Sequence, residues 1–172
     1  MIEPTVRSEE PGDYAAISEI VYAAFLNHPL HPPGALPTEH KVVEALREAG
    51  ALSLSLVCEE QGEIVGHLAF SPLPVDDENR DWYMLGPVAV RPDRQRAGLG
   101  SALIREGLRQ MQAQGAAGIA LAGDPNYYCR FDFVSRPELI LEGVPAEYFL
   151  SLPLSGEVPS GRVTMHEAFF VS

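Results

Sequence analysis

The stretch from Trp82 to Gln114 constrains the fold most, because it is typical of a strand, a loop and a helix in succession. The first part, Trp82 to Val90, ends in a continuous apolar run, which favours a buried strand. From Leu99 to Gln114 the apolar residues recur at helical spacing. These apolar residues are Leu103, Ile104, Leu108 and Met111. The chain is therefore predicted to pass from a strand into a helix through a short loop that contains two glycines.

That loop, Arg94 to Gly100, has the properties of an anion site. The first turn of a helix leaves backbone N–H groups unpaired, and the helix dipole favours negative charge there. Gly98 and Gly100 let the backbone approach a phosphate closely, and Gln95 and Arg96 can add side-chain donors. The alternative is that the two glycines only form a tight turn.

Two other phosphate loops fit poorly. A P-loop needs a lysine after its last glycine, but Gly100 is followed by Ser101. A dinucleotide fingerprint needs a third glycine where this chain has Leu103, and its glycines would follow the strand directly. A different nucleotide-type phosphate ligand stays open as an alternative.

The length of 172 residues favours one domain, 1–172, with a core at 1–135 and a C-terminal strand pair at 136–172. The net charge of −12 argues against a nucleic-acid partner. Five of the 12 Lys and Arg residues nevertheless gather near the glycine loop, either around a ligand or as the solvated face of a helix. They are Arg91, Arg94, Arg96, Arg105 and Arg109.

Targeting and redox signals are weak in this sequence. The N-terminus has no basic region followed by an apolar run, and no stretch has the length of a membrane span. Cys58 and Cys129 do not form a disulfide framework. We therefore expect a cytoplasmic protein without a membrane partner.

Periodicity predicts further elements on both sides of the central stretch. Asp13 is a plausible N-cap for a helix that carries Ile17, Ile20, Val21, Ala24 and Phe25 on one face. Prolines exclude helix and strand from Asn27 to Gly34. The other expected helices are Thr38 to Ala49 and Asp124 to Phe131. The expected strands are Thr5 to Ser8, a half-buried one from Leu52 to Cys58, Ile64 to Phe70, Gly118 to Ala122, Leu139 to Leu141 and Arg162 to Val171. This order favours a mixed sheet with helices on both faces.

Two segments together carry a family resemblance. The residues from Val88 to Ile104 resemble the acetyl-CoA signature of the GCN5-related N-acetyltransferases, with Gln95, Gly98 and Gly100 at its defining positions. The run from Asn126 to Phe133 is similar to the second signature of that family, in which a tyrosine stands four residues before a Gly-Phe pair. Asp132 replaces that glycine, at a position where positive φ is expected and tolerated by Asp. The resemblance covers most of the chain from Ile2 to Phe133.

The tail from Val144 to Phe149 is similar to the YhbS-type branch of the same family. The resemblance implies an α/β (α+β) fold with a mixed, mostly antiparallel sheet of about seven strands and helices on both faces. It implies acetyl-CoA as the acyl donor, no metal, and direct attack of a primary amine on the thioester. The acceptor is expected to be a small-molecule or peptidic amine, and a homodimer is compatible with the family.

The same resemblance assigns site residues. Tyr128 matches the tyrosine that protonates the leaving sulfur, although it could also be a packing aromatic. The cofactor-binding residues are implied to be Val88, Ala89, Val90, Gln95, Arg96, Ala97, Gly98, Leu99, Gly100, Ser101 and Asn126. Cys129 is expected to be a small packing residue.

The general base stays open. The candidates are His28 and His31 on the proline loop, a chain of water molecules, and, with less support, His67, Glu78, Asp81 and Asp124. The acidic balance would attract a cationic acceptor, although solubility explains it equally well. The alternative function is a non-catalytic acyl-CoA-binding sensor or regulatory module.

Overall fold

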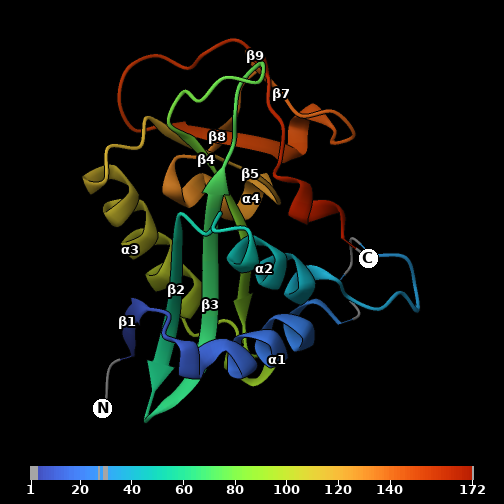
Figure 1. The fold of residues 1–172 in the computed structure, drawn as a ribbon, viewed down its shortest axis with the longest axis vertical. Helices are drawn as coiled ribbons and strands as arrows, with labels where there is room; N and C mark the ends of the chain where they lie inside the picture. Colours follow the sequence, from blue (N-terminus) through green and yellow to red (C-terminus); the bar gives the residue numbers. More distant parts are fainter. Residues whose placement is uncertain (1–3, 27, 29–30, 172) are drawn as a thin grey trace.

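The computed structural model describes residues 4–26, 28 and 31–171. Seven of its strands form one twisted sheet in the order β1-β2-β3-β4-β5-β8-β6 (Figure 1). Their bounds are Thr5–Ser8 for β1, Leu54–Glu60 for β2, Glu63–Pro72 for β3, Trp82–Val90 for β4, Gly118–Ala122 for β5, Val134–Ser135 for β6 and Phe149–Pro153 for β8. Within this sheet only β4 and β5 pair in parallel. The predicted fold class, mixed and mostly antiparallel, is confirmed.

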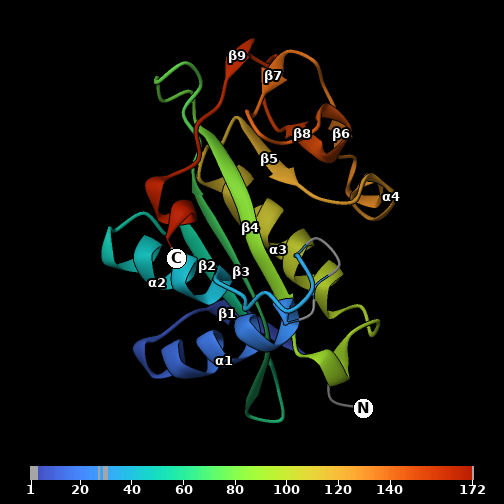
Figure 2. The same ribbon diagram turned by 90° about the vertical axis from the view of Figure 1, so that its right-hand side faces the viewer.

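Helices cover both faces of the sheet (Figure 2). On one face lie α1 (Tyr14–Phe25) and α2 (Glu39–Glu48), which contact each other, and α1 packs on β3 and β4. On the other face α3 (Leu99–Ala113) packs on β2 and β3. The short helix α4 (Pro125–Tyr128) follows β5. In the part of the chain that the structure describes, no helix is long and apolar enough to cross a membrane.

Strand β2 is buried on both faces, so the prediction of a half-buried strand is wrong. Leu54 to Cys58 are all buried, including Ser55. The serines that alternate with leucines suggested a solvent face, but α1 and α2 cover that face. Ser55 is tolerated there because its hydroxyl has two polar partners, Glu9 and His67.

Helix α1 begins directly after Asp13, as predicted, but the Asp13 side chain does not cap it. Asp13 precedes it in helical conformation and makes no side-chain cap to it. Its carboxylate instead accepts a hydrogen bond from the backbone N–H of Glu10 at 2.7 Å and pairs with Arg7. These contacts hold the short 3₁₀ turn η1 (Pro11–Asp13) and lower the pKa of Asp13, the Arg7 bond being the main cause. Ile17, Ile20 and Val21 are buried as expected.

The chain after β5 differs most from expectation. Sequence reasoning missed β8, which pairs with β5 and carries β6 on its other edge. The two expected terminal strands shrink to β7 (Leu139–Ile140) and β9 (Gly161–Arg162), which pair in parallel outside the main sheet. Most of the expected strand from Arg162 to Val171 is not extended, because Glu167–Phe170 forms the 3₁₀ turn η5 against α2. Two further 3₁₀ turns in the chain are η3 (Cys129–Phe131) and η4 (Ala146–Tyr148).

Strands β4 and β5 separate after a short parallel start. Their pairing ends at Met84 and Ala120, and β4 then continues alone on that edge to Val90. The separation occurs next to an irregularity in the β3–β4 register and the cis bond between Gly86 and Pro87. The last part of β4 therefore has one free edge, and its residues Val88 and Val90 line a pocket.

Candidate active site

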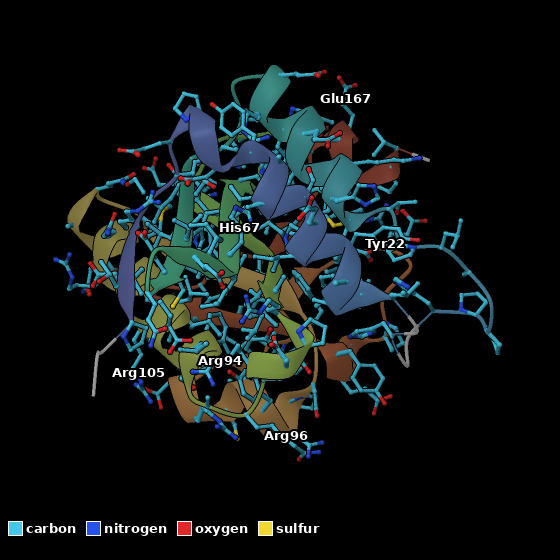
Figure 3. All side chains as sticks on the ribbon, turned by 90° about the horizontal axis from the view of Figure 1, so that it is seen from below. Tyr22, His67, Arg94, Arg96, Arg105 and Glu167 are labelled. Atoms are coloured by element: carbon cyan, nitrogen blue, oxygen red, sulfur yellow. The ribbon has the colours of Figure 1, made fainter. Side chains whose placement is uncertain are left out.

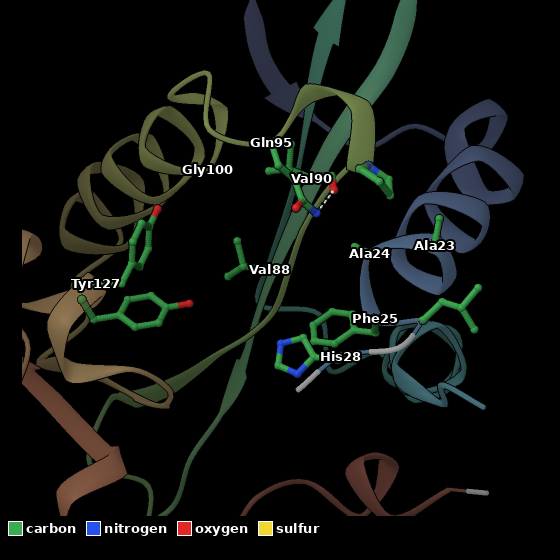
Figure 4. Close-up of a pocket in the computed structure, with 12 residues that line it drawn as sticks. Ala23, Ala24, Phe25, His28, Val88, Val90, Gln95, Gly100 and Tyr127 are labelled. Carbon is green, nitrogen blue, oxygen red and sulfur yellow. Dashed lines mark hydrogen bonds between the residues drawn. The ribbon is translucent and has the colours of Figure 1, made fainter. Parts of the chain in front are cut away.

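The site is an open pocket of about 620 Å³ between the C-terminal end of α1, the free edge of β4, the start of α3 and α4 (Figure 4). Its lining residues are Ala23, Ala24, Phe25, Leu26, His28, Val88, Val90, Pro92, Gln95, Gly100, Tyr127 and Tyr128. Segments far apart in sequence meet there, because the end of α1 forms one wall of the pocket and the start of α3 and α4 form the opposite wall, with β4 between them (Figure 4). Four of the predicted cofactor-binding residues, Val88, Val90, Gln95 and Gly100, line the pocket together with Tyr128.

The end of β4 presents to this pocket backbone groups that no neighbouring strand pairs. The N–H of Arg91 donates to the carbonyl of Val65, so residues 91 and 89 point their polar groups toward β3. By alternation, the N–H and C=O groups of Val88 and Val90 point toward the gap between β4 and β5. Ala89 instead packs its side chain on the α1 face. Of the three predicted β4 residues, Val88 and Val90 are the two that can pair with an extended ligand.

The loop before α3 exposes the backbone donors that sequence reasoning expected. Gly98 precedes the helix with φ +82, and no side chain caps the first turn. The first intrahelical bond in this turn is donated by the N–H of Ala102 to the carbonyl of Gly98. The amides of Leu99, Gly100 and Ser101 are therefore left for another acceptor.

Gly100 marks the space in front of these amides. A Cβ added to Gly100 would lie 3.3 Å from the hydroxyl oxygen of Tyr127 and 3.7 Å from a methyl carbon of Val90. Any larger side chain would fill the cleft between α3, β4 and Tyr127. The glycine thus keeps a narrow channel open at the N-terminus of the helix.

The remaining predicted loop residues differ in exposure. Gln95 donates from Nε2 to the carbonyl of Val90 at 3.1 Å, which satisfies one of the free β4 groups. Arg96 (φ +67) and Ala97 are exposed. Asn126 is exposed on α4, and its N–H donates to the carboxylate of Asp124, which caps that helix. Neither Ser101 nor Asn126 lines the pocket among the described residues.

The arginine cluster is largely neutralised within the protein. Arg94 makes two hydrogen bonds of 2.7 Å to Glu60, and Arg91 pairs with Asp93 and Glu63. Arg109 pairs with Glu106 on α3, and the guanidinium of Arg105 lies over the ring of Phe131. Figure 3 places Arg94, Arg96 and Arg105 on the same side of the molecule. The sequence indicated a concentration of positive charge, but the carboxylates that balance it were not evident.

The two adjacent tyrosines have different surroundings. Tyr127 points its hydroxyl toward Gly100, and the guanidinium of Arg130 lies 4.4 Å from its ring centroid (Figure 4). Tyr128 packs its ring against Gly123 and Phe133. Burial, with a smaller effect of Tyr127, raises the pKa of Tyr128 to about 12. Its phenol is therefore protonated at neutral pH, the form that donates a hydrogen bond or a proton.

Asp132, which stands where the resemblance predicted glycine, has φ +71 and ends η3. The expected positive φ is confirmed, and Asp adopts it. The chain thus leaves η3, the turn that follows Tyr128, without a glycine.

Among the base candidates, His28 lines the pocket, on the side formed by the end of α1 (Figure 4). Burial, and secondarily the nearby His31, lower the pKa of His28 below its ordinary value. His31 bonds through Nε2 to Glu39 at 2.9 Å. Glu78 and Asp81 are exposed on the loop between β3 and β4, and Asp124 is the cap of α4.

His67 is wholly buried on the α1 face of β3 and does not line the pocket. Its Nε2 contacts the hydroxyl of Ser55 at 2.8 Å, and that hydroxyl donates to Glu9, which Arg47 holds by two hydrogen bonds. Burial lowers the pKa of His67 to about 4, so the ring is neutral at pH 7. The expectation of a satisfied sheet histidine holds for Nε2, whereas Nδ1 has no partner among the described residues. Sequence reasoning missed the Glu9–Arg47 part of this network, for which no local signal exists.

Among the described residues, no group of His, Cys, Asp and Glu side chains could hold a metal ion. Both cysteines are free, and the exposed Cys129 lies 3.5 Å from the carbonyl of Asn126.

Comparison with known proteins identifies the family. The model of the Acetyltransferase (GNAT) family matches residues 16–130. The N-acetyltransferase YhbS of Escherichia coli is 34% identical over 129 residues, which cover 74% of this chain and 72% of that protein. The crystal structure of E. coli YhbS in complex with CoA superposes with a TM-score of 0.89 at 30% identity and covers 99% of this chain and 94% of that one.

A second solved structure is closer in sequence. A GNAT family acetyltransferase from Brucella melitensis, determined in complex with acetyl-CoA, is 42% identical with a TM-score of 0.84. The alignment covers 97% of this chain and 98% of that one. This chain therefore belongs to the acetyltransferase (GNAT) family, and acetyl transfer from acetyl-CoA is its function.

Proposed function

We propose that acetyl-CoA binds between β4 and α4 with its pyrophosphate at the start of α3. The acetyl group then passes directly to a primary amine held against the C-terminal end of α1. The observation that carries this proposal is the coincidence of two sets of unpaired backbone groups. One set is on the free edge of β4, and the other is at the uncapped N-terminus of α3.

The pyrophosphate position is supported by the amides of Leu99, Gly100 and Ser101. These amides lie at the positive end of a 15-residue helix, α3, and would donate to a bound anion. Gln95, Arg96 and Ala97 form the loop that would surround the phosphates. Because Arg94 is already paired with Glu60, Arg96 is the loop arginine that we expect to contribute charge.

The pantetheine arm would extend along β4, where the amide groups of Val88 and Val90 are positioned to pair with it as a neighbouring strand would. Asn126 stands on α4 at the opposite side of the gap. Gln95 now occupies the carbonyl of Val90, so its side chain is expected to turn away when the arm pairs there.

When bound, acetyl-CoA supplies a thioester carbonyl that an amine can attack without further activation. The phenol of Tyr128 lines the pocket and stays protonated, so it can donate to the sulfur as the C–S bond breaks. The raised pKa makes complete proton transfer from the phenol to a thiolate unfavourable, since a thiol has a pKa of about 8.5. We therefore assign Tyr128 to hydrogen-bond stabilisation of the leaving sulfur.

The experiment is release of the CoA thiol from acetyl-CoA in the presence of a panel of small-molecule and peptidic amines, combined with binding of acetyl-CoA, CoA and NAD. Amine-dependent release and selective binding of the two CoA forms support the proposal. Binding of acetyl-CoA without release for any amine would identify a non-catalytic acyl-CoA-binding module, and binding of NAD alone would identify a nucleotide site.

A further inference from the structure

The acceptor side of the pocket differs in chemistry from the cofactor side. It is formed by Ala23, Ala24, Phe25, Leu26 and His28 from the end of α1 and the residues after it. No described residue that lines the pocket carries a carboxylate. In a protein with 24 acidic residues, the part of the wall that faces the acceptor is apolar, with one imidazole.

Glu39, the described acidic residue that acts on His28, is already engaged in other contacts. Glu39, at the start of α2, has both carboxylate oxygens in use. Its Oε2 contacts His31 at 2.9 Å, and its Oε1 accepts a hydrogen bond from the N–H of Thr38 at 3.1 Å. An ammonium group packed against this apolar wall would lose part of its hydration without gaining an ion pair from a described lining residue, which is unfavourable.

His28 has the position and the form that proton removal requires. Its ring lies 5.2 Å from that of Phe25 and 5.6 Å from that of His31, which restricts its orientation. Figure 4 shows it across the pocket from Tyr127, with Val88 between the two sides. Among the described residues, His31 favours the neutral form of His28, and Glu39, whose effect is weaker, opposes it. A neutral imidazole can accept a proton at pH 7.

We propose that His28 accepts the proton of the attacking amine and that the pocket acetylates weakly basic amines carried on an apolar group, such as an α-amine beside an apolar side chain or an arylamine. This inference rests on the proposed function. The amine nitrogen forms a bond to the carbonyl carbon, the C–S bond breaks, and the proton on nitrogen moves to His28. The sulfur leaves as a thiolate hydrogen-bonded to Tyr128. His28 returns its proton to solvent, and the thiolate is protonated from solvent.

The selectivity follows from the fraction of free amine. At pH 7.5 an α-amine with a pKa near 8 is about one-quarter neutral, whereas a lysine-like amine is neutral in about one molecule in a thousand. Because the pKa of His28 is below its ordinary value, His28 is too weak a base to deprotonate a lysine-like ammonium. The acceptor therefore has to arrive largely uncharged.

A matched pair of acceptors tests the substrate class. Phenylalaninamide and 2-phenylethylamine share the same ring and spacing, but the amine of the first is much less basic, and spermidine provides a cationic control. At pH 7.5 we expect kcat/KM for phenylalaninamide to exceed that for 2-phenylethylamine by at least about tenfold, with spermidine slowest. Equal rates, or a preference for spermidine, would overturn the substrate class.

The role of His28 is tested with aniline as acceptor, because aniline stays uncharged as the pH falls to 5.5. His28→Gln should lower kcat about 100-fold and remove the fall in rate at acid pH, and free imidazole should restore part of the activity of His28→Ala. His40→Gln is the matched control, since His40 packs edge-on against Tyr22 away from the pocket. NMR titration of the His28 ring provides a readout independent of turnover, and its pKa should be below 6.5.

These experiments distinguish a failure of the proposed function from a failure of the role of His28. Failure of the wild type to bind acetyl-CoA, or to release thiol with any amine, would overturn the proposed function and this inference with it. Amine-dependent release that persists unchanged in His28→Gln, with the same acid limb and normal acetyl-CoA affinity, would overturn the role of His28 alone.

Discussion

Replacing Gly100 separates ligand binding from folding more cleanly than replacing Gly98. Gly98 has φ +82, so alanine there is strained by about 1–2 kcal/mol and weakens the fold as well as the site. Gly100 has no positive φ and lies in the first turn of α3. Alanine at Gly100 gains up to about 1 kcal/mol of helix propensity, which offsets the tight 3.3 Å contact of its Cβ with the Tyr127 hydroxyl.

The expected loss is therefore in affinity for CoA. A methyl at Gly100 narrows the channel before the helix amides, and valine fills it. Loss of one charge-assisted hydrogen bond to the pyrophosphate costs about 1.5–3 kcal/mol, which raises the Kd for CoA about 10- to 150-fold. Isothermal titration calorimetry with CoA measures this, and thermal unfolding checks the fold.

Gly12→Ala is the control for exchanging a glycine by alanine, since a Cβ at Gly12 meets nothing within 4 Å and its φ is not positive. This variant should keep the wild-type Kd. A folded Gly100→Val protein that binds CoA with wild-type affinity would refute the assignment of the pyrophosphate to this helix terminus.

Three further predictions concern catalysis, charge and stability. Tyr128→Phe should slow turnover by up to about 100-fold with little change in acetyl-CoA affinity, whereas Tyr127→Phe should not; full activity in both variants would make Tyr128 a packing residue. Arg96→Ala should weaken CoA binding more at low salt than at high salt, and Arg94→Ala should show a smaller salt dependence because its charge is paired. The free energy of unfolding should fall as the pH drops from about 6.5 to 4, because His67 becomes protonated in the unfolded chain but stays neutral in the folded protein. The loss approaches about 3 kcal/mol. His67→Gln should flatten this part of the dependence of the unfolding free energy on pH, measured by urea unfolding.

The central strand, loop and helix could be predicted from sequence because their signals are local. Trp82–Val90 and the start at Leu99 agree with the prediction, and Gly118–Ala122 does as well. The family resemblance then located the loop and Tyr128 without any knowledge of tertiary contacts.

What was missed depends on long-range contacts. β8 has a buried Ser151 and ends at Pro153, so its pattern resembled that of a loop, and it becomes a strand by pairing with β5. The Arg94–Glu60 pair joins residues 34 positions apart, so the neutralised charge could not be inferred from composition. The sequence placed both His28 and His31 on a loop expected to border the acceptor pocket, and only the tertiary structure distinguishes them, because His28 lines the pocket whereas His31 contacts Glu39.

The most direct test of the account is a crystal structure of the complex with acetyl-CoA. In that complex the pyrophosphate should lie on the amides of Leu99 to Ser101, the pantetheine arm along Val88 and Val90, and the acetyl group between Tyr128 and His28. Acetyl-CoA bound elsewhere, for example in the groove lined by Glu60, Arg91 and Arg94, would contradict it.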